Sequence, residues 1–333
     1  MPGENDRLIE LIKGSVEWQK WGPYLPERLW GTVRECLSDP QEAWHYTTFE
    51  TAHQQNYLTG DDGIFGWCDS TGTLCFSFVF WNGKDPILKE RFFGLSGGEG
   101  IHGEDVKEIY YYLDAVPTYS YAKAMYRYPC EEFPYELLRE ENRKLILCDP
   151  EFEIINTGIF DRKNFFDIYV EIAKNTPSDI IIKITGFNRS RESQSLHIIP
   201  QFWFRNTWLW SSLLGKSAGK PLISKASSNQ IVFAHKNLGE YRLEIGNTSP
   251  ETKYQLLFTE NDAYPDNFQE FIKSSKTRRD AFTQAIIHNN SEYISEQNKG
   301  TKVGIWFSFN VPPESSVTVT LRLSSLQELP VNQ

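Results

Sequence analysis

The densest group of charged side chains that could do chemistry lies between residues 81 and 108. His102 is followed there by the carboxylates Glu104 and Asp105, which in principle supply the acid and the base of glycoside hydrolysis. That reaction needs two carboxyl groups about 5–10 Å apart across a sugar ring, and adjacent residues rarely meet this requirement. Three roles therefore stay open for the segment: catalysis, a substrate rim or domain interface, and ion pairs that fix a loop.

A second segment, residues 200–210, contains three tryptophans and two phenylalanines around Arg205 and Asn206. Aromatic faces stack on the apolar faces of sugar rings, and Arg and Asn donate hydrogen bonds to hydroxyls. Trp203 and Trp208 are thus candidates for a sugar-binding platform, and the alternative is a strand end packed in the core. Further along, Glu260 and Asn261 follow a predicted strand, either as loop caps or as polar groups of a rim.

Other motifs exclude several kinds of chemistry. The glycine-rich residues 94–100 lack the Lys-Ser/Thr pair of a phosphate-binding loop and contain Glu99. No HExxH pair or CxxC pair occurs, and the Ser, His and Asp residues are scattered along the chain. We therefore expect no nucleophilic acyl chemistry, no metal and no cofactor.

Composition limits the class of partner. The chain has 333 residues and a net charge of −10, which argues against nucleic acid as a partner because phosphate neutralisation needs clustered Lys and Arg. No run approaches the roughly 18 apolar residues that span a bilayer, and the N-terminus lacks the apolar segment of a secretory signal. We expect no membrane partner and a cytoplasmic location.

The elements that position these residues are mostly strands. Aromatic residues make up 14% of the chain, and apolar and polar types alternate in residues 165–173 and 317–323, as in a sheet with one solvated face. We predict an all-β fold, a large two-sheet antiparallel super-sandwich with a few short helices in long loops. Strands are predicted at residues 74–81, 108–116, 152–156, 165–173, 179–188, 196–204, 230–235, 241–245, 254–259, 303–311 and 316–323.

Helices are predicted at residues 6–21, 119–127, 135–147 and 267–287. The predicted domain plan is an N-terminal helix or arm at residues 1–20, the sandwich at residues 21–324 and a C-terminal tail at residues 325–333.

Several motifs follow one another in an order that points to a known family. They are Trp21–Glu35, Trp81–Arg91, Glu99–Glu108, Trp203–Trp208, Leu257–Asn261, Gly300–Lys302 and Val317–Leu323. Over residues 16–324 the chain thereby resembles the amino-terminal region of glycoside hydrolase family sixty-three, the group of mannosyl-oligosaccharide glucosidase and its bacterial glucosidase-like relatives.

The resemblance implies a β-sandwich that precedes an (α/α)₆ barrel, and the catalytic Asp and Glu of such enzymes lie on that barrel. It ends with the last sandwich strand, so no catalytic residue is carried over to this chain. By analogy, the substrate rim or domain interface is expected at Lys84, Asp85, Lys89, Glu90, Arg91, His102, Glu104 and Asp105.

The leading hypothesis is a non-catalytic, carbohydrate-associated sandwich that works with an (α/α)₆ catalytic barrel, which is either supplied by a separate chain or lost by truncation. Its first alternative is a free-standing oligosaccharide-binding module that uses the aromatic residues 203–210. Its second alternative is an autonomous hydrolase that uses Glu104, Asp105 or Glu260.

Overall fold

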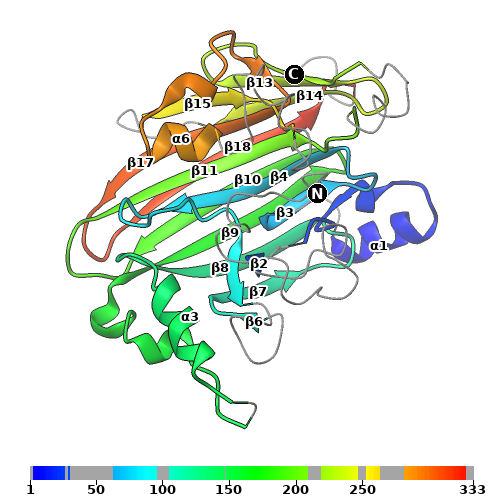
Figure 1. Cartoon of the computed structure of the whole chain (residues 1–333). Helices are drawn as coiled ribbons and strands as arrows, with labels where there is room; N and C mark the ends of the chain where they lie inside the picture. Colours follow the sequence, from blue (N-terminus) through cyan, green and yellow to red (C-terminus); the bar gives the residue numbers. More distant parts are fainter. Residues whose placement is uncertain are drawn as a thin grey trace, which may run out of the picture.

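Two antiparallel sheets form most of the computed structural model (Figure 1), which describes residues 3–26, 29–30, 63–95, 105–146, 148–208, 219–246, 253–262 and 281–327. The six-stranded sheet has the order β1-β3-β4-β11-β17-β15. Its strands are β1 (Trp21–Gly22), β3 (Ile64–Asp69), β4 (Leu74–Trp81), β11 (Gln194–Phe204), β17 (Lys302–Val311) and β15 (Tyr254–Thr259).

The nine-stranded sheet has the order β16-β12-β13-β14-β18-β10-β9-β8-β7. Its strands are β16 (Lys299–Gly300), β12 (Leu222–Lys225), β13 (Gln230–His235), β14 (Gly239–Ile245), β18 (Ser316–Ser325), β10 (Asp179–Asn188), β9 (Phe165–Thr176), β8 (Tyr121–Pro129) and β7 (Ile109–Ala115). A small third sheet joins β2 (Leu29–Trp30), β5 (Phe92–Leu95) and β6 (Asp105–Val106).

Helices are short and lie outside the sheets (Figure 1). The α-helices of the described ranges are α1 (Glu4–Ile12), α3 (Tyr135–Arg143) and α6 (Ala281–Ile286). Single 3₁₀ turns are η1 (Trp18–Lys20), η2 (Ile154–Thr157), η3 (Asp161–Lys163) and η5 (Ser291–Tyr293). The all-β prediction is therefore confirmed.

The main core lies between the two sheets because every second side chain of each strand points inward. Phe76, Phe78 and Phe80 of β4 pack in one cluster with Ile168 and Val170 of β9. The opposite face of the six-stranded sheet is buried too, and this explains why β4 is apolar almost throughout. The opposite face of the nine-stranded sheet is more polar, which explains the alternation in β9 and β10.

Strand ends define the two ends of the sandwich. We call the "Asn82 end" the one where β4 and β8 finish and β9 and β11 begin. The "Arg205 end" is the opposite one, where β11 and β13 finish and β4 and β17 begin. Loops at the two ends carry the two groups of residues singled out from the sequence.

Two predicted elements are wrong, and both depend on packing. Residues 121–129 form strand β8 in place of the helix predicted at 119–127, because Ala124, Tyr126 and Tyr128 face the core while the residues between them face outward. The strand predicted at 152–156 is replaced by η2, whose Ile154 packs beside α3. Of the helix predicted at residues 267–287, the structure describes the last part, which forms α6. Residues 267–280 lie outside the described residues.

Candidate functional site

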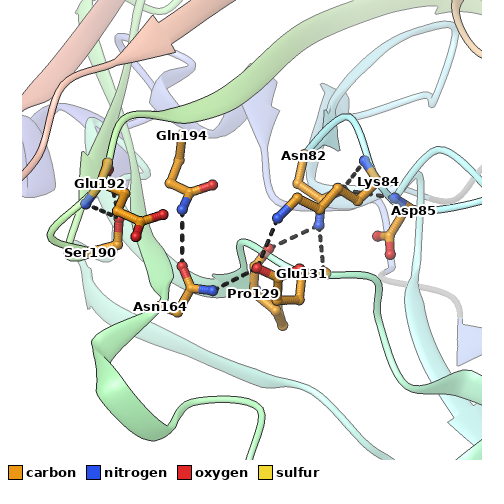
Figure 2. Close-up of polar contacts among 9 residues, drawn as sticks. All are labelled: Asn82, Lys84, Asp85, Pro129, Glu131, Asn164, Ser190, Glu192 and Gln194. Atoms are coloured by element: carbon orange, nitrogen blue, oxygen red, sulfur yellow. Dashed lines mark hydrogen bonds and ion pairs between the residues drawn. The ribbon is translucent and has the colours of Figure 1, made fainter.

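The loop that follows β4 is tied to the Asn82 end of the sandwich (Figure 2). The side-chain oxygen of Asn82 accepts hydrogen bonds from the backbone N–H groups of Lys84 and Asp85, both at 2.9 Å, while its Nδ2 donates to the carbonyls of Pro129 and Glu131 at 3.0 and 2.7 Å. Gly83 supplies the positive φ of 81° that this turn requires. One asparagine thus joins the end of β4 to the end of β8.

A chain of side-chain contacts extends this link across the sheets (Figure 2). Lys84 Nζ lies 2.8 Å from Glu131 Oε1, which also accepts a 2.9 Å hydrogen bond from Asn164. Gln194, at the start of β11, donates to Asn164 at 3.2 Å. The hydrogen bond from Lys84 lowers the pKa of Glu131. These polar contacts cross-link the Asn82 end, and Lys84 is half-exposed at its margin.

Deeper in the same loop, Lys89 forms a buried ion pair with Glu108. Lys89 Nζ lies 3.2 Å from Glu108 Oε1, and both side chains are 0% exposed. Lys89 also donates to the Tyr135 hydroxyl at 2.7 Å and lies 3.7 Å from the Phe133 ring centroid. Burial lowers the pKa of Lys89 and raises that of Glu108, and each shift is opposed by the charge of the partner.

Carboxylates around this pair are satisfied from within the chain. Glu108 accepts hydrogen bonds from the Tyr126 hydroxyl and the Phe93 backbone N–H. Asp85 accepts from the Tyr128 hydroxyl and the Phe133 backbone N–H. Burial raises the pKa of Asp85 against the effect of the Lys89 ammonium. Such a network fixes a loop, because buried charges need both a partner and further hydrogen bonds.

Four of the eight residues in the first candidate group are buried and do not line a rim. Asp85, Lys89, Glu90 and Arg91 are 2%, 0%, 9% and 4% exposed, and they pack inside the chain where a rim contact was expected. The reason is that the loop folds inward over β8 and α3, which the local sequence does not show. His102 and Glu104 lie outside the described residues, and the backbone of Asp105 lies in β6.

The second candidate group does come together, at the Arg205 end. Asn261 Nδ2 donates to the carbonyl of Phe204 at 2.9 Å, and Trp208 Nε1 donates to Asp262 at 2.7 Å. Glu260 accepts a 2.7 Å hydrogen bond from Thr301 and lies 3.6 Å from Lys220 Nζ. Residues 203–208 and 260–262, distant in the sequence, are thus one structural unit because β15 and β11 both pair with β17.

The tryptophans of this unit face inward. Trp203 is 3% exposed and packs with Leu25, Cys68 and Cys75, and Trp208 is 7% exposed. Asn206 and Asn261 are each 1% exposed. A stacking platform needs an open ring face, so the structure does not support that role for Trp203 and Trp208. Trp210 lies outside the described residues.

Arg205 remains partly open and borders a small pocket of about 170 Å³. The pocket is lined by Thr73, Phe204, Arg205, Thr207, Pro221, His235 and Asn237. Its polar lining residues are an arginine, a histidine, an asparagine and two threonines, and none of the lining residues is Asp or Glu. The pocket is suited to bind an acceptor-rich ligand, and it lacks the pair of acids that glycoside hydrolysis requires.

Sequence reasoning identified Arg205 but missed His235, Asn237 and Thr73. They come from the β13–β14 and β3–β4 turns, and only strand pairing places those turns beside the end of β11. In the described ranges, no group of three or more His, Cys, Asp and Glu side chains is arranged to hold a metal ion. No helix within these ranges is long and apolar enough to cross a membrane.

Comparisons with known proteins give one clear relative. No profile of a known protein family matches the chain. The sequence is 37% identical over 352 residues to the Saccharomyces cerevisiae protein "Uncharacterized protein YMR196W", and the match covers 97% of this chain and 32% of the yeast protein. The chain thus spans about a third of the length of this relative.

Proposed function

We propose that this chain is the β-sandwich portion of a glucosidase-like glycoside hydrolase, that it is non-catalytic by itself, and that it docks an (α/α)₆ catalytic barrel carried by a separate chain. The two-sheet fold is the one that the resemblance to family sixty-three implies. The match to a yeast protein of which it covers only 32% supports the idea that such a sandwich works together with further polypeptide.

The observation that carries the proposal is an exposed apolar strip on β7. Tyr111, Tyr112 and Leu113 are consecutive and are 55%, 59% and 48% exposed. We call these three residues the "β7 strip". Large apolar side chains that remain in water side by side are typical of a surface that another protein covers.

The position of the β7 strip strengthens this argument. β7 is the outermost strand of the nine-stranded sheet and pairs with β8 alone among the described strands. Tyr110 and Tyr112 turn toward Phe92 and Phe65, with ring centroids 4.0 and 5.8 Å apart, so one face of the strand is anchored. Tyr111 lies between them and points to the other face, because side chains alternate along a strand, and Leu113 is an extra residue where the pairing with β8 shifts register. Tyr112 is thus held on one face of β7, and Tyr111 is available to a partner on the other.

The test measures binding of the 333-residue chain to a separately expressed polypeptide, the part of YMR196W outside the match. We expect a complex by sedimentation velocity and calorimetry. Replacing Tyr111→Ser together with Leu113→Ser should weaken it about tenfold or more, because buried aromatic anchors dominate interface energies. The matched control is Ile12→Ser, since Ile12 is an equally apolar residue of α1 that is 82% exposed.

Two outcomes would contradict the proposal: no complex at micromolar concentrations with the unmodified chain, or equal affinity for the double variant and the Ile12→Ser control. Turnover of α-linked glucosides by the purified chain alone would instead favour the autonomous hydrolase.

A further inference from the structure

The pocket at the Arg205 end is lined by residues from four parts of the chain. Arg205 directly follows β11, and its backbone N–H donates to the carbonyl of Thr73 at 3.0 Å, which ties it to the β3–β4 turn. Phe204 stacks on His235, the last residue of β13, with ring centroids 5.6 Å apart. The strands on either side therefore hold the pocket walls in a fixed arrangement.

The guanidinium of Arg205 lies against the β3–β4 turn. Its Nη2 donates to the carbonyl of Thr71 at 3.3 Å. Gly72 has a φ of 64°, and a Cβ built there would lie 3.2 Å from Nη1 of Arg205. Glycine at this position thus permits both the turn and the close approach of the guanidinium.

Arg205 has no carboxylate partner within the described residues. Asp69, the acid of the same turn, is occupied by the backbone N–H groups of Thr71, Thr73 and Leu74 at 2.9, 2.8 and 2.7 Å. The Nε of Arg205 is buried and has no hydrogen-bond partner in the described part of the chain. A carboxylate or phosphate oxyanion is the group that satisfies a guanidinium best, and with Nε buried it would meet the terminal nitrogens of Arg205.

His235 lines the same pocket. Its Nδ1 accepts hydrogen bonds from the backbone N–H groups of Asn237 and Leu238, both at 3.2 Å, so a neutral ring carries its proton on Nε2. Burial lowers the pKa of His235, and the Asp69 carboxylate opposes this shift. Thr73, Thr207 and Asn237 complete the polar lining.

We propose that this pocket binds the terminal oxyanion of a small ligand, a phosphate monoester or a carboxylate. The guanidinium of Arg205 supplies the charge, and the imidazole and hydroxyl groups around it supply further donors. None of the lining residues is Asp or Glu, and the carboxylate that acts on His235, Asp69, is already held by three backbone N–H groups, which favours an anion over a cation. This inference does not rest on barrel docking, because β13 and β7 lie far apart in the strand order of the nine-stranded sheet (Figure 1).

The test is calorimetric titration of the 333-residue chain with inorganic phosphate, glucose 6-phosphate, glucuronate and glucose. We expect at least one anionic probe to bind about tenfold or more tightly than glucose. Arg205→Gln should weaken that binding about tenfold or more, because it removes the charge and the fork of donors. The matched control is Arg189→Gln, since Arg189 pairs with Asp167 near the Asn82 end, 2.8 Å apart.

The outcomes separate the sources of the oxyanion. Binding of phosphate and glucose 6-phosphate alone assigns a phosphate monoester, binding of glucuronate alone assigns a carboxylate, and binding of both supports the shared chemistry. Anionic probes that bind no better than glucose overturn the proposal, as does unchanged binding by Arg205→Gln. Should that variant fail to fold, Arg205→Lys replaces it, and weaker anion binding is again expected. In the unmodified chain, an NMR shift of the His235 ring on adding the anion tests the same pocket.

Discussion

Two lysines of one loop, Lys84 and Lys89, show how position decides what a charge contributes. Lys84 is 44% exposed and pairs with Glu131 in water, where an ion pair is weak. Lys89 is fully buried, and its ammonium is held by Glu108 and the hydroxyl of Tyr135. Removing one partner of such a buried pair leaves the other charge without compensation.

We therefore expect Lys89→Met to lower the free energy of unfolding by about 3–5 kcal/mol. Lys84→Met, the matched control in the same loop, should change it by less than about 1 kcal/mol. Urea denaturation followed by fluorescence measures both. The double variant Lys89→Met with Glu108→Gln should recover part of the loss, because Glu108 is then no longer a buried charge without a partner. Equal effects of the two lysine substitutions would refute this account of the loop.

His197 makes stability depend on pH. Burial lowers its pKa to about 4 from an ordinary value of 6.5, and its Nδ1 accepts a 2.9 Å hydrogen bond from Trp306 Nε1, which a protonated ring cannot accept. Between pH 6.5 and 4 the unfolded chain therefore binds a proton that the folded chain does not. The stability that the neutral ring contributes is fully present above pH 6.5 and is lost as the pH falls through this window.

We expect the free energy of unfolding to fall between pH 7 and pH 4.5 more steeply in the unmodified chain than in His197→Gln. The difference should reach at most about 1.4 kcal/mol per pH unit inside the window, the value for one proton. His288→Gln, a substitution at an exposed histidine, should follow the unmodified chain. Parallel curves for the unmodified chain and His197→Gln would show that His197 does not titrate differently on unfolding.

At the scale of elements, α6 packs on the outer face of the six-stranded sheet, directly over Gly304 of β17. Phe282 and Ile286 pack with Val79 and Ile199. A Cβ built on Gly304 would lie 2.9 Å from two atoms of the Phe282 ring and 3.2 Å from Ile199. The helix can therefore approach the sheet this closely only because position 304 has no side chain.

Gly304→Ala should lower the free energy of unfolding by about 1–3 kcal/mol, because the ring has to move out of a packed site. Gly219→Ala is the control, since nothing lies within 4 Å of a Cβ built there. Adding Phe282→Leu to Gly304→Ala should cost less than the sum of the two single changes, because the smaller side chain leaves room for the methyl group. Chemical denaturation of the four variants measures this, and an unaffected Gly304→Ala would contradict it.

At the scale of the whole molecule, the sandwich separates its two proposed surfaces. The β7 strip lies on the last strand of the nine-stranded sheet, and the pocket lies beside β13 near the other edge. We therefore expect the Tyr111 and Leu113 double variant to bind the anionic probes normally, and Arg205→Gln to bind the part of YMR196W outside the match as the unmodified chain does. Either proposal can fail while the other holds.

Much of the sheet was predictable because the signals for it are local. β4, β10, β13 and β15 have the bounds predicted from alternating or continuous apolar runs between turn residues. β8 was not, because Ala122, Ala124 and Met125 favour a helix locally and only their pairing with β7 and β9 makes them a strand. The candidate site was predictable only in part, through Arg205, since its other walls come from distant turns.

The sequence by itself determined the all-β class and most strands, because the period of two that buries one face of a sheet is written in neighbouring residues. Tertiary structure decided which charged side chains and which tryptophans are buried, and it brought Arg205 and His235 to the same pocket. Those outcomes depend on contacts between residues far apart in the chain, such as Phe204 with His235 and Lys89 with Glu108. No local pattern encodes such contacts, because they exist only after the strands have paired.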